Sequence, residues 1–298
     1  MVNMTSSKKE IAYWLSLVLY GILLVGLLLY LRFPGGKFRQ FSCDLIEKRI
    51  PGVTCSIGST GYGFPLKILY GDVQLSDAVN SEVKFFEDSL LVIEPVWRNP
   101  TRAISLQSNA FGGSHSGLLV IEDENDTIEL RDLRISNLDL GKLQFLQGKL
   151  DRNLTGLLEA QVSSVLEAQG FTIVTAQGSI GVSEGTLELK KPILELTTFE
   201  IQESSFDFDM KGKELKISNG EVTNPKLKVN FAGEMTLAEP ILAGTISLQG
   251  GITPQAHLFQ GKRELKTIVT RMQRRYGDVS LPFRIDGTIG RPTFVFER

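Results

Sequence analysis

The segment that decides the fold runs from Phe206 to Phe231 and reads FDFDMKGKELKISNGEVTNPKLKVNF. Apolar and polar residues alternate in Phe206-Asp207-Phe208-Asp209-Met210 and again in Leu227-Lys228-Val229-Asn230-Phe231. Because successive side chains of a strand point to opposite faces, this alternation predicts strands with one apolar and one solvated face. Gly, Asn and Pro lie between the runs and predict the turns that connect them.

Similar runs extend outward from this segment in both directions. They occupy residues 66–70, 118–121, 128–130, 186–190 and 245–248. Their spacing, often about ten residues, indicates a large antiparallel sheet rather than alternating βαβ units. We therefore predict a mainly β fold, a long curved antiparallel sheet with one apolar concave face and a few short amphipathic helices. The residues expected on the apolar face are Leu187, Leu189, Phe206, Phe208, Leu227, Val229 and Phe231.

Helical spacing of apolar residues predicts short helices over 38–50 and 138–150, whereas 154–167 fits either a helix or a strand. A further helix is predicted over 264–276, with an apolar stripe and a basic opposite face. The basic side chains proposed as contacts are Lys266, Arg271, Arg274 and Arg275. They could meet anionic lipid headgroups or an acidic partner. Alternatively, the helix closes the end of the sheet and its basic face meets only water.

Residues 11–31 form a run of twenty-one residues without a charge, long enough to cross about 30 Å of bilayer. We predict an uncleaved transmembrane anchor, because a signal peptide would have a shorter apolar stretch ending at small residues. Basic residues lie on both sides of the run, so the charge pattern leaves the orientation open.

Cys43 and Cys55 are the only two cysteines, and their spacing does not match a zinc motif. In an oxidising compartment they could close a short disulfide loop. Two unpaired buried thiols are the alternative.

Little in the composition suggests catalysis or nucleic-acid binding. The 298 residues carry 32 basic and 34 acidic side chains, a formal charge of −2, which gives no electrostatic case for nucleic acid. The two histidines, His115 and His257, lie in segments that predict turns, and neither belongs to a hydrolase motif. We predict no catalytic residues, no metal site and no cofactor, and therefore a protein that is not an enzyme.

Several short motifs resemble a known family. They are Tyr62-Gly63-Phe64-Pro65, Leu154-Thr155-Gly156, residues 244–254 (GTISLQGGITP) and residues 281–292 (LPFRIDGTIGRP). Together with the apolar N-terminal run, their order resembles the type II secretion system protein N family in its longer form. The last motif is also similar to the C-terminal region of AsmA-like proteins.

The resemblance implies a single-pass protein of the Gram-negative inner membrane. Residues 1–10 would form a cytoplasmic tail, 11–31 the anchor, 32–52 a linker with an amphipathic helix, and 53–298 a periplasmic β domain that could subdivide near 138–153. It implies a non-enzymatic component of type II protein secretion, a scaffold that contacts other secretion proteins. The alternative is an AsmA-like protein that binds or carries phospholipid for envelope assembly.

Overall fold

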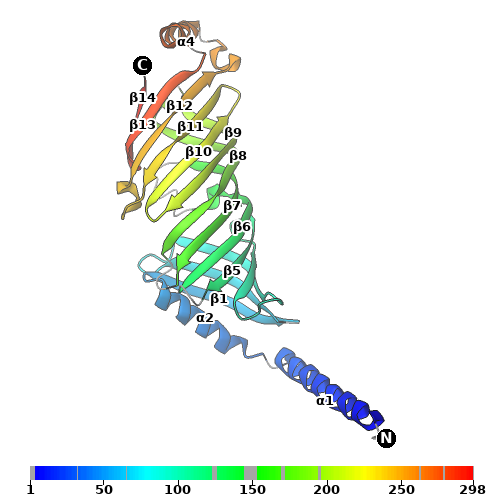
Figure 1. Cartoon of the computed structure of the whole chain (residues 1–298). Helices are drawn as coiled ribbons and strands as arrows, with labels where there is room; N and C mark the ends of the chain where they lie inside the picture. The colour runs from blue at the N-terminus through cyan, green and yellow to red at the C-terminus, as the bar shows by residue number, and fades with distance from the viewer. Residues whose placement is uncertain are drawn as a thin grey trace.

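A computed structural model describes residues 4–31, 33–64, 66–122, 126–143, 153–168, 172–193, 196–261, 263–277 and 279–297. Within these residues the chain forms one antiparallel sheet of 14 strands, whose order in space is their order in the chain (Figure 1). The strands are β1 (Val53–Gly63), β2 (Lys67–Asp77), β3 (Lys84–Pro95), β4 (Ala103–Ser108), β5 (Ser114–Glu122), β6 (Thr127–Asp139), β7 (Leu154–Glu167), β8 (Ile173–Ile193), β9 (Leu196–Lys211), β10 (Glu214–Thr223), β11 (Leu227–Thr236), β12 (Thr245–Pro254), β13 (Leu281–Thr288) and β14 (Arg291–Phe296).

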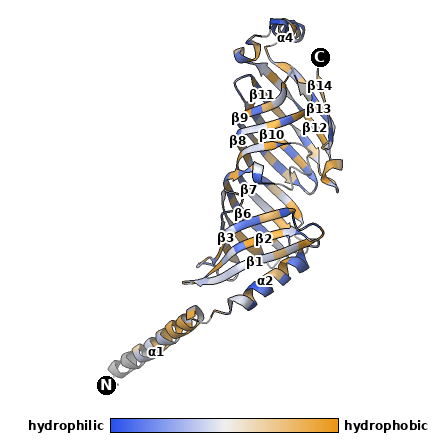
Figure 2. Cartoon of the chain, turned by 180° about the vertical axis from the view of Figure 1, so that it is seen from behind, coloured by the Kyte–Doolittle hydropathy of each residue, from blue (hydrophilic) through white to orange (hydrophobic). Residues whose placement is uncertain are grey.

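The mainly β prediction is confirmed, and the alternating sequence explains it. In β11, Leu227, Val229 and Phe231 are shielded from solvent, while Lys228 and Asn230 are exposed. Figure 2 shows the same alternation of polar and apolar residues along the other strands. We call the face that carries the shielded apolar residues the inner face, and the opposite one the outer face.

Helices lie at the two ends of the sheet (Figures 1 and 2). They are α1 (Met4–Leu31), α2 (Gly35–Arg49) and α4 (Arg263–Tyr276), with short 3-10 turns η1 (Leu140–Lys142), η2 (Ile241–Ala243) and η3 (Ala256–Phe259). Over the described part of the chain, none of the helices combines the length and apolarity needed to cross a membrane. The structure therefore does not support the transmembrane part of the fold prediction.

The body of the molecule is elongated rather than compact. Its accessible surface is 19527 Å², whereas a compact monomer of the same mass would expose roughly 12500 Å². The difference reflects the projecting helices and a long sheet whose inner face is only partly covered. Two clusters of buried apolar side chains lie at opposite ends of this sheet.

The N-terminal cluster is small and is covered by α2. Ile57, Tyr70 and Val73 are its buried members, and Phe38 of α2 packs against them. Cys43 of α2 and Cys55 of β1 form a disulfide, with Cα atoms 5.2 Å apart. The helix is thus attached to the first strand by a covalent bond.

The C-terminal cluster is larger and is covered by η3 and α4. Leu265 and Val269 of α4 are 4% and 0% exposed, and they pack with Leu258 of η3 against the sheet. The sheet contributes Leu227, Ile252, Leu281 and Phe283. The helix predicted over 264–276 is confirmed, although Ile268, placed on its apolar stripe by sequence, is 51% exposed.

The segment between the two halves of the sheet differs from the predicted helix over 138–150. Leu138 and Asp139 end β6, and η1 follows, started by a hydrogen bond from the Gly141 N–H to the Asp139 side chain. Residues 144–152 lie outside the described part of the chain. Residues 154–167 form a strand, β7, which pairs directly with β6, so the sheet continues across the region of the proposed subdivision.

Candidate functional site

A row of seven apolar residues and two glycines crosses nine neighbouring strands on the inner face. Each member of the row is the register partner of the next, from β6 to β14. With about 4.8 Å between neighbouring strands, the row spans about 38 Å. We call it the apolar stripe; its members are Leu133, Val162, Gly178, Phe208, Ile217, Gly233, Leu248, Ile285 and Phe294.

The members of the stripe range from buried to half-buried. Ile217 is 6% exposed, and the other members are half-buried. A second row lies beside the stripe, in which Ile135, Ala160, Ile180 and Phe206 are successive register partners. The Phe206 ring lies 6.3 Å from that of Phe231, centroid to centroid, which extends the apolar surface toward β11.

The sequence-predicted face residues divide between this open surface and the closed C-terminal core. Phe208 belongs to the stripe, and Phe206 to the row beside it. Leu187 pairs with Phe199, which packs against the C-terminal cluster, and Leu189 is half-buried in the same strand. Val229 and Phe231 also pack against that cluster.

Leu227 is 1% exposed and belongs to the core beneath η3 and α4, so it is not available to a ligand. Alternation placed it on the correct face, but only the tertiary structure shows that two helical segments cover it. Of the nine stripe members, only Phe208 was among the face residues predicted from sequence. The signal that would have found the others is strand register, which depends on turns and bulges far apart in the chain.

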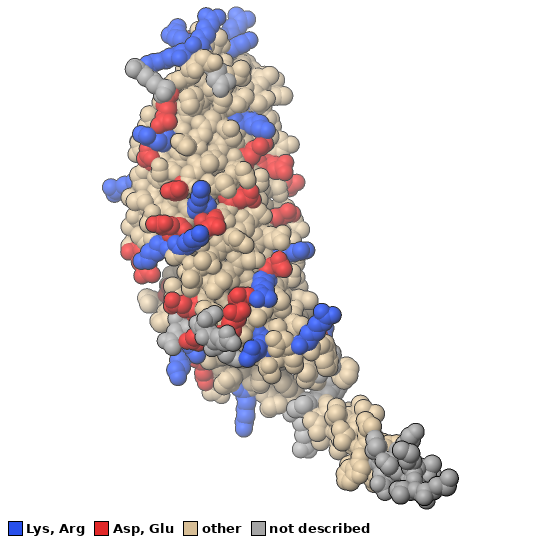
Figure 3. Space-filling model, in the orientation of Figure 1, with Lys and Arg blue, Asp and Glu red and all other residues tan. Residues whose placement is uncertain are grey.

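The outer face is charged and carries exposed ion pairs (Figure 3). Lys228 and Glu221 are 2.7 Å apart on adjacent strands, and this hydrogen-bonded lysine holds the pKa of Glu221 below its usual range. Asp207 on the same face accepts a hydrogen bond from Asn219. No group of three or more potential metal ligands is present among the described residues.

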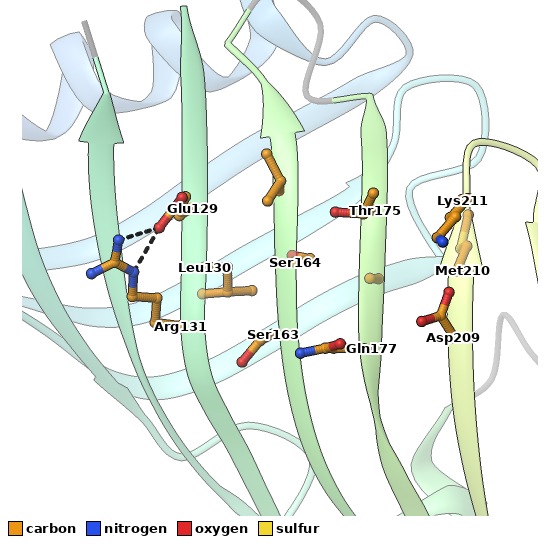
Figure 4. Close-up of a pocket in the computed structure, with 12 residues that line it drawn as sticks. Glu129, Leu130, Arg131, Ser163, Ser164, Thr175, Gln177, Asp209, Met210 and Lys211 are labelled. Carbon is orange, nitrogen blue, oxygen red and sulfur yellow. Dashed lines mark hydrogen bonds and ion pairs between the residues drawn. The ribbon is translucent and has the colours of Figure 1, made fainter. Parts of the chain in front are cut away.

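Cavities near the stripe have mixed linings rather than a catalytic constellation. One of about 440 Å³ is lined by Leu130, Ala176 and Met210 together with charged residues (Figure 4). Arg131 forms an ion pair with Glu129 there, while Ser163, Gln177 and Asp209 lie on neighbouring strands. Gln177 and Asp209 are exposed and alternate along their strands with the stripe members Gly178 and Phe208, so this part of the lining belongs to the outer face.

His115 has polar partners that the sequence did not predict. Its Nδ1 lies 3.2 Å from Ser108 Oγ and 3.5 Å from the Ala110 nitrogen. Burial lowers the pKa of His115, and the nearby charge of Asp88 partly opposes that effect. Asp88 is 1% exposed, and its Oδ1 accepts hydrogen bonds from the Leu90 and Asn109 N–H groups.

This arrangement lacks the connections of a hydrolytic triad. A triad needs the acid bonded to one ring nitrogen and the nucleophile to the other. Here Ser108 and a backbone N–H share Nδ1, while Asp88 Oδ1 accepts hydrogen bonds from backbone N–H groups. The three residues instead fix the β4–β5 turn, where the backbone of Phe111 and Gly112 is left-handed.

The predicted basic residues of α4 gather at one end of the molecule. Lys266, Arg271, Arg274 and Arg275 are all exposed, and Figure 3 shows this cluster of blue side chains beyond the last strands.

Comparison of the chain with protein-family models, with curated proteins and with solved structures gives no match. The structural features above therefore carry the functional argument.

Proposed function

We propose that this protein is a non-enzymatic component of the Gram-negative cell envelope whose sheet binds the acyl chains of phospholipid. The observation that supports this function is the apolar stripe, which crosses nine strands with seven apolar side chains, two glycines and no polar side chain. One acyl chain spans about 15 Å, half of a 30 Å bilayer core. The stripe is therefore longer than one chain, so a lipid could bind at several positions along it.

Two other features support a location at the inner membrane, with the sheet in the periplasm. Apolar side chains of α1 are exposed, among them Trp14 at 64% and Leu23 at 60%, and water is a poor environment for such a surface. The Cys43–Cys55 disulfide supports export, because the cytosol keeps thiols reduced.

A photo-crosslinking amino acid tests the lipid-binding function in the full-length protein in cells. We would place it at Phe208 on the inner face and, as a matched control, at Gln177 on the outer face one strand away. The expected result is a lipid adduct at position 208, identified by mass spectrometry, and none at position 177. Equal lipid labelling at both positions, or none at position 208, would contradict the proposal.

A second candidate function is an interaction scaffold in type II protein secretion. The structural observation that favours it is β14, the last strand of the sheet. Its edge opposite β13 pairs with no strand within the described chain. Such an edge can accept a strand from a partner protein. Val295 on β14 is 51% exposed.

The same crosslinker at Val295 separates the two functions. A secretion protein attached at position 295, with no lipid at position 208, would favour the scaffold. Lipid at position 208 with no protein adduct at position 295 would favour the lipid-binding function.

A further inference from the structure

The end of the molecule opposite α1 carries a concentrated positive charge. Helix α4 contains five basic side chains and one acidic one, a formal charge of +4 in a chain whose total is −2. The five are exposed, and none of them takes part in an ion pair found in the described residues. They are Arg263, Lys266, Arg271, Arg274 and Arg275.

Exposed apolar residues accompany this charge. Ile268 is 51% exposed, and Arg271 and Arg275 follow it by three and seven positions, which places all three on one side of the helix. Val279, just after the helix, is 65% exposed. Leu265 and Val269, on the neighbouring side of the helix, are buried in the C-terminal cluster, so the sheet holds this basic face outward.

We infer that the outward face of α4 docks on the surface of an anionic phospholipid membrane. Positive charge around a few exposed apolar residues matches the interface of such a bilayer, where headgroups are anionic and apolar groups insert shallowly. The position at the tip of an elongated body leaves the face accessible to a flat surface (Figures 1 and 3). An acidic protein partner would satisfy the charges but would not require Ile268 and Val279.

This inference goes beyond the proposed lipid binding by the sheet and is tested separately from it. The full-length protein, with α1 shielded by a nonionic amphipol, is immobilised through an N-terminal tag. Vesicles of phosphatidylcholine with about 30% phosphatidylglycerol, or of phosphatidylcholine alone, are then passed over it. We expect capture of the anionic vesicles only, and weaker capture when salt rises from about 50 to about 300 mM.

Variants assign the binding to α4. Each basic residue near an anionic surface contributes about fivefold to binding, so R271Q/R274Q/R275Q should reduce capture at least about tenfold. The matched control K211Q/K213Q/K216Q removes three exposed lysines from β9, β10 and the turn between them and should leave capture unchanged. I268S should weaken capture, whereas V79S, at a 98% exposed position, should not.

Three results would overturn the inference. The first is equal capture of neutral and anionic vesicles, and the second is an equal loss of capture in the two triple variants. The third is binding of polyglutamate to the wild-type protein without capture of anionic vesicles, which would point to an acidic protein instead. Equal thermal unfolding midpoints of all variants serve as the control for folding.

Discussion

A helix covers each end of the sheet, but the two helices are held in different ways. At the C-terminal end, α4 buries Leu265 and Val269 in an apolar cluster. At the N-terminal end, no residue described in α2 is buried, although Phe38 and Cys43 contact the sheet. Polar bonds supplement those contacts, including one from Arg39 to the Gly58 carbonyl and one from the Cys55 N–H to Glu47.

Because of this difference, α4 and α2 should detach from the sheet under different conditions. Apolar burial weakens in denaturant, whereas a disulfide is broken by a reductant. Most of the stripe lies between the two ends, whereas its last members, Ile285 and Phe294, already pack against the C-terminal cluster. Accordingly, the attachment of α4 to the sheet should be weakened most by mutation of its buried apolar residues. The attachment of α2 should be weakened most by loss of its disulfide.

The largest expected effect comes from one substitution made at both ends. Leu265 in α4 is 4% exposed, and Leu45 in α2 is 46% exposed. Leu265→Ala leaves a cavity and should lower the free energy of unfolding by about 2–5 kcal/mol. Leu45→Ala should cost less than about 0.5 kcal/mol, because its side chain is largely solvated. Urea unfolding of the full-length protein, followed by circular dichroism, measures both; equal losses would refute the contrast.

Removal of the disulfide should have the next largest effect. Cys43 and Cys55 are separated by 12 positions, and the chain-entropy model gives about 3 kcal/mol for closing a loop of that length. We expect C43S/C55S to lower the urea midpoint and to increase hydrogen exchange in α2, with little change in α4. Reduction of the wild-type protein should reproduce both effects. If hydrogen exchange became faster in α4 as well, the two helices would not be held independently, and the prediction would be wrong.

The sequence predicted the strands best where alternation is uninterrupted, as in 206–210 and 227–231. Residues 154–167 were ambiguous because their composition also suits a helix; in the structure the register with β8 shifts between Thr155 and Leu157, at a bulge whose extra residue belongs to β8. Gly156 sits in that bulge with a φ of 133°. Leu157 and Leu158 are adjacent apolar residues, so the pattern of two that identifies a strand is lost in this part of the sequence.

The candidate site was predictable only in part. Phe206 and Phe208 could be placed on an apolar face from local alternation, but the stripe requires the register of nine strands. Similarly, helical spacing placed Ile268 with Leu265, although the sheet end covers only one side of α4 and leaves Ile268 in solvent. The partners of His115 are unpredictable for the same reason, since Asp88 comes from another strand.

The smallest expected effect concerns pH and distinguishes the two halves of the sheet. The C-terminal cluster is apolar, whereas the N-terminal half contains His115 beside buried Asp88. Because burial lowers the pKa of His115 below its ordinary value of 6.5, the unfolded chain binds the proton more readily. The stabilisation of the folded state that comes with a neutral His115 is fully present above pH 6.5 and is lost as the pH falls through and below that value.

Because only one proton is involved, the free energy of unfolding should change by less than about 1.4 kcal/mol per pH unit, and solvent around the half-buried ring lowers this slope further. We expect the wild-type unfolding midpoint to fall between about pH 7.5 and about pH 5.5, and His115→Asn to flatten that dependence. His257→Asn, which changes the histidine next to the C-terminal cluster, is the matched control and should keep the wild-type slope. If the two variants changed the slope equally, the acid sensitivity would not reside in the N-terminal half, and burial of His115 would not be its cause.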